Sequence, residues 1–553
     1  MDYDRILTQL GEFGRWQQRN AALLWLPAVG AGINVLIAAF AVMGPRNGYR
    51  CRNACDGDGD FSFGDWLKPE FNLTEADMFP EPDDYCSYYK ATPTANGGCS
   101  FDKNAIIDCK SGDDFAYEEF EMDVTVATAN NLVCGDYFWT IIVDEFFMLG
   151  LMIGSFVFGV MSDKIGRRHT LVISIVCCAV GNLLGCAMPN HWSYAIPRIL
   201  ASAGGEGTFV LAFTMSLEYA GVKESIPVFS WVTWSTLLAN VIGIPFAIGE
   251  AIPSAFALGL KDWKTFQAAV SSLIAITAVV WFFLPESPRW LIANGKTERA
   301  REMIEKAAKV NKVKLTADIF EADPAEGEKS SVELPIYGLK DMFRRSQILI
   351  TLALFVCWPV VTLLYYGLSL SADKIKITEN VYLSFALVAL IEMPAYVILP
   401  LVIDVWGRKP LFFVTQFVPG ICCIVAAFLP TGTFFAILAL GAKLGAAAAF
   451  NVTFMYTAQL YPTSIRNSAV GTCSTVARLG GMLAPVVGKF LVETGEVPEE
   501  LPMTLFGAFG IVGGLCALLL PDTVGFPLPN TFEDIEEIKK KSKPMWKCYR
   551  AEE

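Results

Sequence analysis

Charged side chains occur inside stretches of this chain that are otherwise almost free of charge. They are Asp144, Glu145, Glu206, Glu392, Lys443 and Arg478. A charge within a long apolar segment is costly to bury, so it marks a place where an ion, a substrate or an opposite charge is held. Carboxylates attract cationic groups, and an arginine holds a carboxylate through two parallel hydrogen bonds. The set therefore predicts a site for small charged organic molecules.

Two of the acids lie where helices loosen or approach closely. Glu206 is surrounded by glycines in SAGGEGTF, which let helices approach or leave room for a ligand. It could bind a cationic headgroup or pair with a basic residue such as Arg198. Glu392 precedes Pro394, where a helical backbone loosens, and could line a cavity or pack between helices.

The basic residues offer the complementary contact. Arg478, in STVARLGGM, could hold a substrate carboxylate or form an ion pair with Glu392 or Glu206. Lys443 lies near the middle of its apolar run but could extend its ammonium group outward.

Polar and aromatic side chains complete the candidate substrate site. Of the adjacent Asp144 and Glu145, we expect at least one to face an outer vestibule and attract cations. Asn34 could bind substrate, a coupling ion or a neighbouring helix. Five aromatic residues could cage an ammonium group through cation–π contacts of roughly 0.5–2 kcal/mol each, or could instead pack against lipid. They are Trp231, Trp234, Trp358, Tyr365 and Tyr366.

No arrangement typical of an enzyme accompanies these charges. The chain has two histidines, His169 and His191, and it lacks a nucleophile elbow and a phosphate-binding glycine-rich loop. We expect no enzymatic activity, no catalytic or metal-binding residue and no cofactor. The coupling ion, sodium or a proton, is left open.

Apolar runs of about 20 residues carry these side chains. The chain has 553 residues, 53% of them hydrophobic, and a mean hydropathy of +0.42. About 20 apolar residues cross a hydrocarbon core of ~30 Å as a helix. The sequence therefore predicts an all-α membrane protein with twelve transmembrane helices. They are expected at 21–43, 137–160, 169–189, 193–217, 226–248, 265–284, 347–368, 379–403, 410–430, 433–458, 467–493 and 502–520.

The distribution of charge orients these helices. The net charge is −13, but residues 51–136 alone contain 19 acidic and five basic residues. Basic residues gather elsewhere, at the ends of apolar runs, in the linker at 289–345 and in the tail at 539–543. The positive-inside rule therefore places both termini in the cytoplasm and the acidic segment outside, at the plasma membrane. Since the basic residues follow the membrane ends, we expect a lipid bilayer and no nucleic acid as a partner.

Six cysteines lie in the acidic segment, out of 15 in the chain. They are Cys51, Cys55, Cys86, Cys99, Cys109 and Cys134. An even set in an extracellular loop predicts up to three disulfides, with 15 pairings left open. Free thiols are the alternative, and a zinc site is disfavoured because the loop has no histidine. The sequon at Asn72 predicts glycosylation in the same loop.

Three short motifs recur with nearly one spacing. Asp404 follows Asp163 by 241 positions, and Gln459 follows Glu218 by 241 positions. The third pair is Pro-Glu-Ser at 285–287 and Pro-Asp-Thr at 521–523. The repeats predict two parallel six-helix halves, between which a substrate binds near the bilayer midplane.

The repeated residues lie at the cytoplasmic edge of the membrane, where they are expected to form a latch between transport states. The alternative is that they only anchor the loops in the cytosol. Asp163 is expected to face a helix N-terminus or an arginine of the other half. The latch candidates are Asp163, Gly166, Arg167, Arg168, Glu218, Glu286, Arg289, Asp404, Gly407, Arg408, Gln459 and Arg466.

The domain boundaries follow from the spans and the linker. We expect a cytoplasmic N-terminus, an N-terminal bundle with a large extracellular loop, a cytoplasmic linker with helices, a C-terminal bundle and a cytoplasmic tail. In that order the segments are 1–20, 21–284 with its loop at 44–136, 285–346, 347–520 and 521–553.

These motifs resemble those of the major facilitator superfamily and, more narrowly, of solute carrier family 22, over nearly the whole chain. The cysteine-rich loop after the first span carries part of the resemblance. The quoted motifs are GVMSDKIGRR (159–168), PESPRWLIANGKTERA (285–300), YYGLSL (365–370), IEMPAY (391–396), YTAQLYPTSIRN (456–467) and PDTVGFPLPNT (521–531). One departure is Gln459, where the family usually has Glu, which implies a weaker latch in that half.

The resemblance implies a transporter of organic ions that works by alternating access. In this family an acid is common at the place of Glu392, and anion and carnitine transporters tend to have Arg at the place of Arg478. With acids and a basic residue in one cavity, we expect a small organic cation or zwitterion, such as a carnitine-like compound, β-alanine or a carcinine-like amine. An organic anion transporter and a non-transporting substrate sensor are the alternatives. We expect a monomer.

Overall fold

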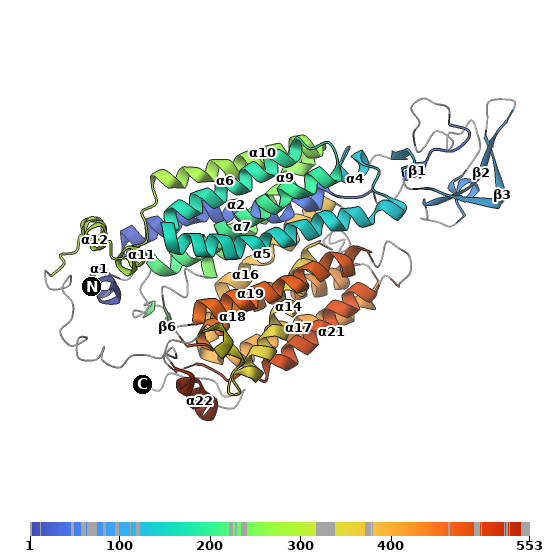
Figure 1. Cartoon of the computed structure of the whole chain (residues 1–553). Helices are drawn as coiled ribbons and strands as arrows, with labels where there is room; N and C mark the ends of the chain where they lie inside the picture. Colours follow the sequence, from blue (N-terminus) through green and yellow to red (C-terminus); the bar gives the residue numbers. More distant parts are fainter. Residues whose placement is uncertain are drawn as a thin grey trace.

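The computed structural model is a long bundle of helices with a small strand-containing segment at one end (Figure 1). The structure describes residues 3–11, 13–45, 49–56, 62, 74–80, 85–94, 99–110, 112–117, 122–219, 225–226, 229–233, 240–316, 338–370, 378, 380–430, 432–462, 465–490, 498, 500–524, 526, 529 and 531–542.

The N-terminal bundle is built from helices that pack mainly on one another, with α7 between α5 and α6 and with α2 against α9. The bounds are α2 (Arg15–Ala41), α5 (Phe138–Ile165), α6 (Arg167–Cys186), α7 (His191–Tyr219), α9 (Gly243–Gly259) and α10 (Trp263–Ile276), which continues as the 3-10 helix η3 (Thr277–Phe282).

In the C-terminal bundle, α17 is packed between α18 and α21, and α14 packs against α19 as α2 packs against α9. Its helices are α14 (Ile348–Leu370), α15 (Val381–Leu390), α16 (Met393–Trp406), α17 (Arg408–Ala427), α18 (Thr433–Gln459), α19 (Arg466–Pro485), which continues as the π-helix η6 (Val486–Phe490), and α21 (Leu501–Ala517).

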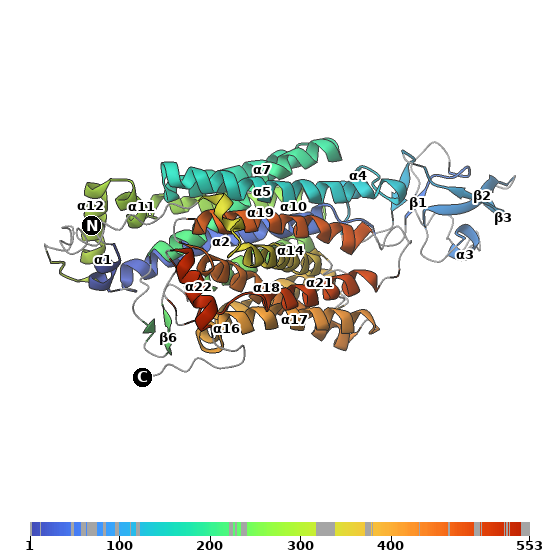
Figure 2. The same ribbon diagram turned by 60° about the horizontal axis from the view of Figure 1, so that its bottom comes forward.

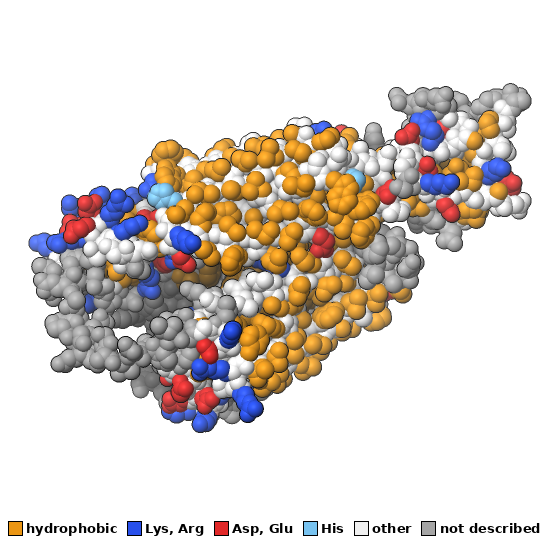
Figure 3. Space-filling model, viewed as in Figure 1, with side chains coloured by type: hydrophobic (Ala, Val, Ile, Leu, Met, Phe, Trp, Pro, Cys, Tyr) orange, Lys and Arg blue, Asp and Glu red, His pale blue; other side chains and the backbone are white. Residues whose placement is uncertain are grey.

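Twelve helical segments follow the order of the twelve predicted spans, and eleven of them lie at the predicted positions. In the part of the chain that the structure describes, nine are long and apolar enough to cross a membrane, and α9 and α21 are shorter apolar helices. The twelfth is α7, whose 29 residues suffice in length but include buried charges. Apolar side chains cover the long faces of both bundles (Figure 3), as expected for surfaces in contact with lipid.

The fifth predicted span, 226–248, is wrong in its position. Strands β5 (Ser225–Ile226) and β6 (Phe229–Thr233) occupy its first part, and α9 extends to Gly259. The run SIPVFSWVTW is rich in β-branched and aromatic residues, which favour strands. Periodicity alone cannot tell a short apolar strand from a buried helix.

The segment between α2 and α5 contains two antiparallel strand pairs and three disulfides. The disulfides are Cys51–Cys109, Cys55–Cys99 and Cys86–Cys134, so the prediction of up to three disulfides in this loop is confirmed. β1 pairs with β4 and β2 pairs with β3. Asn72 lies outside the described residues. The elements are β1 (Tyr49–Cys51), α3 (Glu75–Met78), β2 (Ser87–Pro93), β3 (Cys99–Asp108), β4 (Phe115–Tyr117), α4 (Val126–Ala129) and η2 (Cys134–Asp136).

Short helices gather at the opposite end of the bundles. We call this the terminal end, because α1 and α22 both lie there, and we call the end with β1–β4 the disulfide end (Figures 1 and 2). Asn311 ties α12 to the N-terminal segment, since it accepts from the Trp16 N–H at 2.8 Å and donates to the Leu10 carbonyl at 3.0 Å. The short helices are α1 (Tyr3–Leu10), α11 (Pro288–Ala293), α12 (Thr297–Asn311), η5 (Leu339–Phe343) and α22 (Phe532–Lys541).

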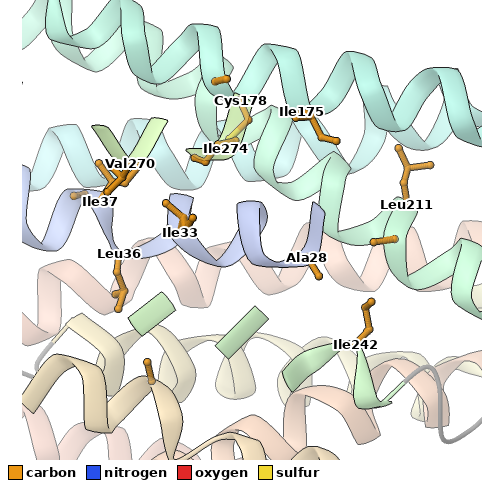
Figure 4. Close-up of a cluster of buried hydrophobic side chains, with 14 of the residues drawn as sticks. Ala28, Ile33, Leu36, Ile37, Ile175, Cys178, Leu211, Ile242, Val270 and Ile274 are labelled. Carbon is orange, nitrogen blue, oxygen red and sulfur yellow. The ribbon is translucent and has the colours of Figure 1, made fainter. Parts of the chain in front are cut away.

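Apolar packing holds each bundle together and closes the two bundles at the disulfide end. Within the N-terminal bundle, side chains of α2, α6 and α10 turn toward one another (Figure 4). Between the bundles, the ring of Phe40 lies 5.0 Å from that of Phe385 and 6.0 Å from that of Tyr382.

Candidate functional site

Glu392 and Lys443 form an ion pair inside the C-terminal bundle. Glu392 lies at the break between α15 and α16, and its Oε1 is 2.6 Å from Lys443 Nζ with both side chains buried. Lys443 also donates to the Ser369 hydroxyl at 2.6 Å, and its ammonium lies 3.4 Å from the centre of the Tyr365 ring. The expectation that Lys443 extends outward is therefore wrong, because these partners replace water around the ammonium.

The hydroxyl of Tyr365 connects this pair to a second buried acid in the other bundle. It lies 3.1 Å from Glu250 Oε1 on α9 and 3.1 Å from Glu392 Oε2. Glu392 Oε2 also accepts a hydrogen bond from the Tyr396 hydroxyl at 2.6 Å. We call Glu250, Tyr365, Glu392, Tyr396 and Lys443 the glutamate–lysine cluster.

A second buried ion pair joins the bundles directly. Arg478 on α19 donates to Glu206 Oε1 on α7, and the two side chains are 3% and 11% exposed. Arg198, the other partner considered for Glu206, instead donates to Asn182 at 3.0 Å and lies over the ring of Phe147. The two charges of the Glu206–Arg478 pair neutralise each other. Either charge alone would be costly to bury within the membrane.

The glycines beside Glu206 serve close helix approach. A Cβ on Gly205 would lie 2.5 Å from Asn34 Nδ2, and a Cβ on Gly204 would lie 2.3 Å from the backbone nitrogen of Cys178. Any larger residue would therefore push α7 away from α2 and α6. Glu206 is held at the inner face of its bundle by this packing.

Asn34 contacts neighbouring helices. Its Oδ1 accepts from Asn182 at 2.8 Å, its Nδ2 donates to the Ala201 carbonyl at 3.4 Å, and it is 1% exposed. Of the three predicted roles of Asn34, the structure shows the contact with neighbouring helices.

The two adjacent acids of α5 differ in their surroundings. Asp144 is buried and lines a small cavity between α2, α5 and α14, together with Tyr366 and Ser369. Glu145 is half-buried, and its Oε1 has no hydrogen-bond partner among the described residues. Tyr366 also lies close to Gly481 on α19. Asp144 and Tyr366 therefore face the space between the bundles.

The predicted aromatic cage does not form as a unit. Trp358 is packed in the core of the C-terminal bundle, where its indole N–H donates to Thr457 at 3.0 Å and its ring lies 4.7 Å from that of Phe454. Trp231 lies on strand β6 rather than in a membrane helix, and Trp234 lies outside the described residues. Among the described members of the predicted cage, Tyr365 alone provides a cation–π contact to a charge of the site, and that charge is Lys443.

The latch residues of the N-terminal bundle are assembled at the terminal end. The carboxylate of Glu286 accepts hydrogen bonds from the backbone N–H groups of Arg167 and Arg168 at the start of α6, at 2.8 and 3.1 Å. The Arg167 guanidinium pairs with Glu218 at 3.2 Å and with Asp163 at 2.7 Å. The expectation that Asp163 faces a helix N-terminus or the other half is wrong, because Glu286 occupies the helix N-terminus and Arg167 lies one turn away.

Two further residues of this latch contact aromatic rings. The Arg168 guanidinium donates to the Trp281 carbonyl and stacks 4.3 Å from the Trp281 ring centre. The Arg289 guanidinium lies 5.5 Å from the ring centre of Tyr3 on α1. These contacts attach the ends of η3 and α1 to the latch.

The latch of the C-terminal bundle follows the same plan. Asp522 accepts from the backbone N–H of Arg408 at 3.2 Å, in the place that Glu286 has in the first half. Gly166 and Gly407 begin α6 and α17 with φ values of +107° and +99°. Gln459 accepts from Thr523 at 2.6 Å, and Arg466 donates to the Pro529 carbonyl at 3.3 Å. The side chain of Asp404 lies outside the described residues.

Glu250 and Tyr396 were missed by the sequence reasoning. The fifth span was ended at residue 248, which left Glu250 just outside it. The signal was present, since GIPFAIGEAIPSAFALG is an apolar run with one acid near its centre. Tyr396 gives no signal of its own, and its role depends on Glu392 one turn earlier.

Comparison with known proteins gives a consistent family. The family model described as sugar (and other) transporter matches residues 110–538. The Drosophila melanogaster protein named organic cation transporter protein is 31% identical and covers 99% of this chain and 96% of the relative. Human organic cation/carnitine transporter 2 is 28% identical, with 97% and 94% covered. Solute carrier family 22 member 6-A of Xenopus laevis is 29% identical, with 97% and 94% covered.

Solved structures agree on the fold. A partially occluded inward open conformation of the E. coli xylose transporter XylE gives a TM-score of 0.57 at 13% identity, with 93% of this chain and 99% of that chain covered. The proton:xylose symporter XylE bound to 6-bromo-6-deoxy-D-glucose gives 0.54 at 17% identity, with 94% and 99% covered. At these identities the likeness shows the fold alone. The chain is therefore a multi-pass membrane protein of the major facilitator superfamily and belongs to its sugar (and other) transporter family, among the organic cation, carnitine and organic anion transporters of solute carrier family 22.

Proposed function

We propose that this protein moves small organic cations and zwitterions across the plasma membrane by alternating access between its two bundles. The observation that carries the proposal is the buried ion pair between Glu206 and Arg478. A zwitterion has the same two charges, so its ammonium can take the place of Arg478 beside Glu206 and its carboxylate can take the place of Glu206 beside Arg478. This exchange keeps both buried charges neutralised while it separates α7 from α19.

The second group of charges supports preference for a cation over a plain anion. Glu250 and Glu392 supply two carboxyl groups against the single ammonium of Lys443. An anion that entered this region would meet two carboxyl groups and a lysine whose charge is already neutralised by Glu392. The names of the relatives, which include organic cation and organic cation/carnitine transporters, support the same class. Carnitine-like compounds, β-alanine and carcinine-like amines are the candidates of this class.

The two ends of the bundles support an orientation in the membrane. The aromatic contacts of Phe40 close the two bundles against each other at the disulfide end. Disulfides persist in an oxidising compartment, and basic residues gather at the terminal end. The disulfide end is accordingly extracellular and closed in this conformation, both termini are cytoplasmic, and Asn72 is glycosylated. The protein acts as a monomer.

The test is uptake by cells that express the full chain. Labelled carnitine, β-alanine, tetraethylammonium and p-aminohippurate represent zwitterions, a cation and an anion, each with and without sodium. We expect saturable uptake of the zwitterions or of the cation above that of mock-transfected cells. Uptake confined to p-aminohippurate would make the protein an anion transporter. No uptake of any compound, with the protein verified at the cell surface, would contradict transport and favour a sensor.

A further inference from the structure

Hydrogen-bond counting at Tyr365 requires a proton within the glutamate–lysine cluster. The Tyr365 hydroxyl lies 3.1 Å from two carboxyl oxygens, Glu250 Oε1 and Glu392 Oε2. A phenol has one hydrogen, so it donates to only one of them. The other contact needs a hydrogen on the carboxyl group, because two oxygens that face each other with lone pairs alone repel. One of the two glutamates is therefore protonated in this arrangement.

The neighbours identify Glu250 as the protonated one. Glu392 has an ion pair with Lys443 at 2.6 Å and accepts from Tyr396 at 2.6 Å, and both contacts stabilise its charged form. Glu250 is 1% exposed, and within the described part of the chain no basic group pairs with it. An unpaired carboxylate at such a place is far costlier than a neutral carboxyl group that donates a hydrogen bond.

The net charge of the groups around Glu250 is zero only if one proton is bound among them. Its titratable or charged neighbours are Tyr365 and Tyr366 on α14, Glu392 between α15 and α16, Tyr396 on α16 and Lys443 on α18. On the side of α2, the contact next to it is the backbone of Val29 against Gly249. Two ionised acids and one ammonium would leave one net negative charge. With one proton on Glu250 the cluster is neutral.

We propose that Glu250 carries a proton in the empty transporter and releases it when an organic cation binds, so that transport exchanges one proton for one cation. This inference rests on the proposed function and names its coupling ion. The O–H bond of Glu250 breaks, the proton passes to solvent water as the bundles separate, and the cation takes its place beside the carboxylate. The net charge of the cluster and its guest stays at zero in both states.

Proton release on binding tests the proposal directly. Full-length protein in detergent at weak buffering is mixed with labelled tetraethylammonium, a permanent cation that has no proton of its own to lose. A pH dye reports released protons, and filtration reports bound cation. We expect about one proton per bound cation near neutral pH. In lipid vesicles, an inside-acid pH gradient should raise tetraethylammonium accumulation at least threefold over vesicles without a gradient.

Variants assign the proton to its residue. Glu250→Gln should bind tetraethylammonium at least tenfold more weakly, release no proton with the cation that remains bound, and lose the response to the pH gradient. Glu302→Gln on α12, an exposed acid outside the cluster, is the matched control and should release one proton as the unmodified chain does. If Glu250→Gln does not fold, Glu250→Asp keeps the titratable group and should shift the midpoint pH of release by at least half a unit.

The outcomes separate this inference from the proposed function. Binding of tetraethylammonium without proton release by the unmodified chain overturns the inference and leaves the proposed function standing. Proton release that persists in Glu250→Gln, or an unchanged midpoint in Glu250→Asp, overturns the assignment to Glu250. If neither tetraethylammonium nor carnitine binds, the proposed function and the inference both fall.

Discussion

Arg478 on α19 and Glu206 on α7 form a buried ion pair that joins the two bundles, although 272 positions separate them in the chain. In an alternating-access transporter, the bundles rock against each other around a central site. A contact of this kind must be broken or exchanged when they move. Under the proposed function, this pair would tie the energetics of substrate binding to the motion of the bundles.

Neutralising the Glu206–Arg478 pair as a unit should separate its role in stability from its role in transport. Glu206→Gln alone leaves Arg478 buried and unpaired, at a cost of about 3–5 kcal/mol in the free energy of unfolding. The double change Glu206→Gln with Arg478→Gln should recover most of the thermal unfolding midpoint, because no charge is left unpaired. We expect neither variant to transport a zwitterion, as measured by carnitine uptake normalised to surface protein.

One result for the double variant would contradict this role of the pair in transport. If both its unfolding midpoint and its uptake returned to those of the unmodified chain, the pair would be a structural link without contact to substrate. Arg478→Ala with unchanged zwitterion kinetics would by itself remove Arg478 from the carboxylate site.

Gly166 should be far less tolerant of alanine than a nearby helical glycine. Its φ of +107° and ψ of 158° belong to a region that is almost exclusive to glycine, where other residues cost about 1–3 kcal/mol. A Cβ there would also lie 2.3 Å from Oε2 of Glu286, the residue whose Oε1 accepts from the Arg167 N–H at the start of α6. We expect Gly166→Ala to lower the thermal unfolding midpoint.

Gly159 is the control for this change. It lies inside α5, and a Cβ added there would have no described heavy atom of another element within 4 Å. Alanine in a helix interior is favoured over glycine by roughly 0.5–1 kcal/mol. Gly159→Ala should therefore leave the midpoint unchanged or raise it. Equal midpoints for the two variants would show that the turn before α6 is not strained by a side chain.

The sequence predicts the helices well because span length and hydropathy are local properties. The exception, at 226–248, arose where an apolar run rich in aromatic and β-branched residues is followed by a second apolar run. Repeat spacing also located two equivalent contacts, since Glu286 and Asp522 accept from the backbone N–H groups of Arg167 and Arg408 at the starts of α6 and α17. That these contacts act as latches stays a prediction. The repeated spacing of these motifs arises because the two bundles repeat one fold.

Pairing among the charges could not be predicted, because it depends on the rotation and depth of each helix. One residue along a helix turns a side chain by about 100°, so the candidates for Arg478 were both Glu206 and Glu392. In the structure, Arg478 pairs with Glu206, and Glu392 pairs with Lys443. The same limit left the disulfide pairing open among 15 possibilities.

Trp358 should prove to be a packing residue. Its indole N–H donates to the Thr457 hydroxyl inside the C-terminal core, and the side chain is 2% exposed. Trp358→Phe removes this hydrogen bond and leaves Thr457 unsatisfied, so we expect a loss of about 1–3 kcal/mol in stability. The KM for substrate should stay within twofold of that of the unmodified chain. A tenfold or larger rise in KM would return Trp358 to the substrate site.

Removal of the Cys86–Cys134 disulfide should loosen the disulfide end without changing substrate recognition. This bond ties strand β2 to η2, directly before α5, whereas the other two disulfides lie further from a membrane helix. It closes a loop of 48 residues, for which the chain-entropy model gives about 4 kcal/mol of stabilisation.

Both cysteines are changed to serine together, because a single change would leave one thiol free to pair wrongly. We expect a lower thermal unfolding midpoint and less protein at the cell surface. The KM of the protein that reaches the surface should be unchanged, because the paired charges of the site lie on helices that pack on one another independently of this loop. The corresponding double change at Cys55 and Cys99 is the comparison. If the Cys86–Cys134 variant shifted KM tenfold while the Cys55–Cys99 variant did not, the bond before α5 would be setting the position of Asp144 and, through it, the site.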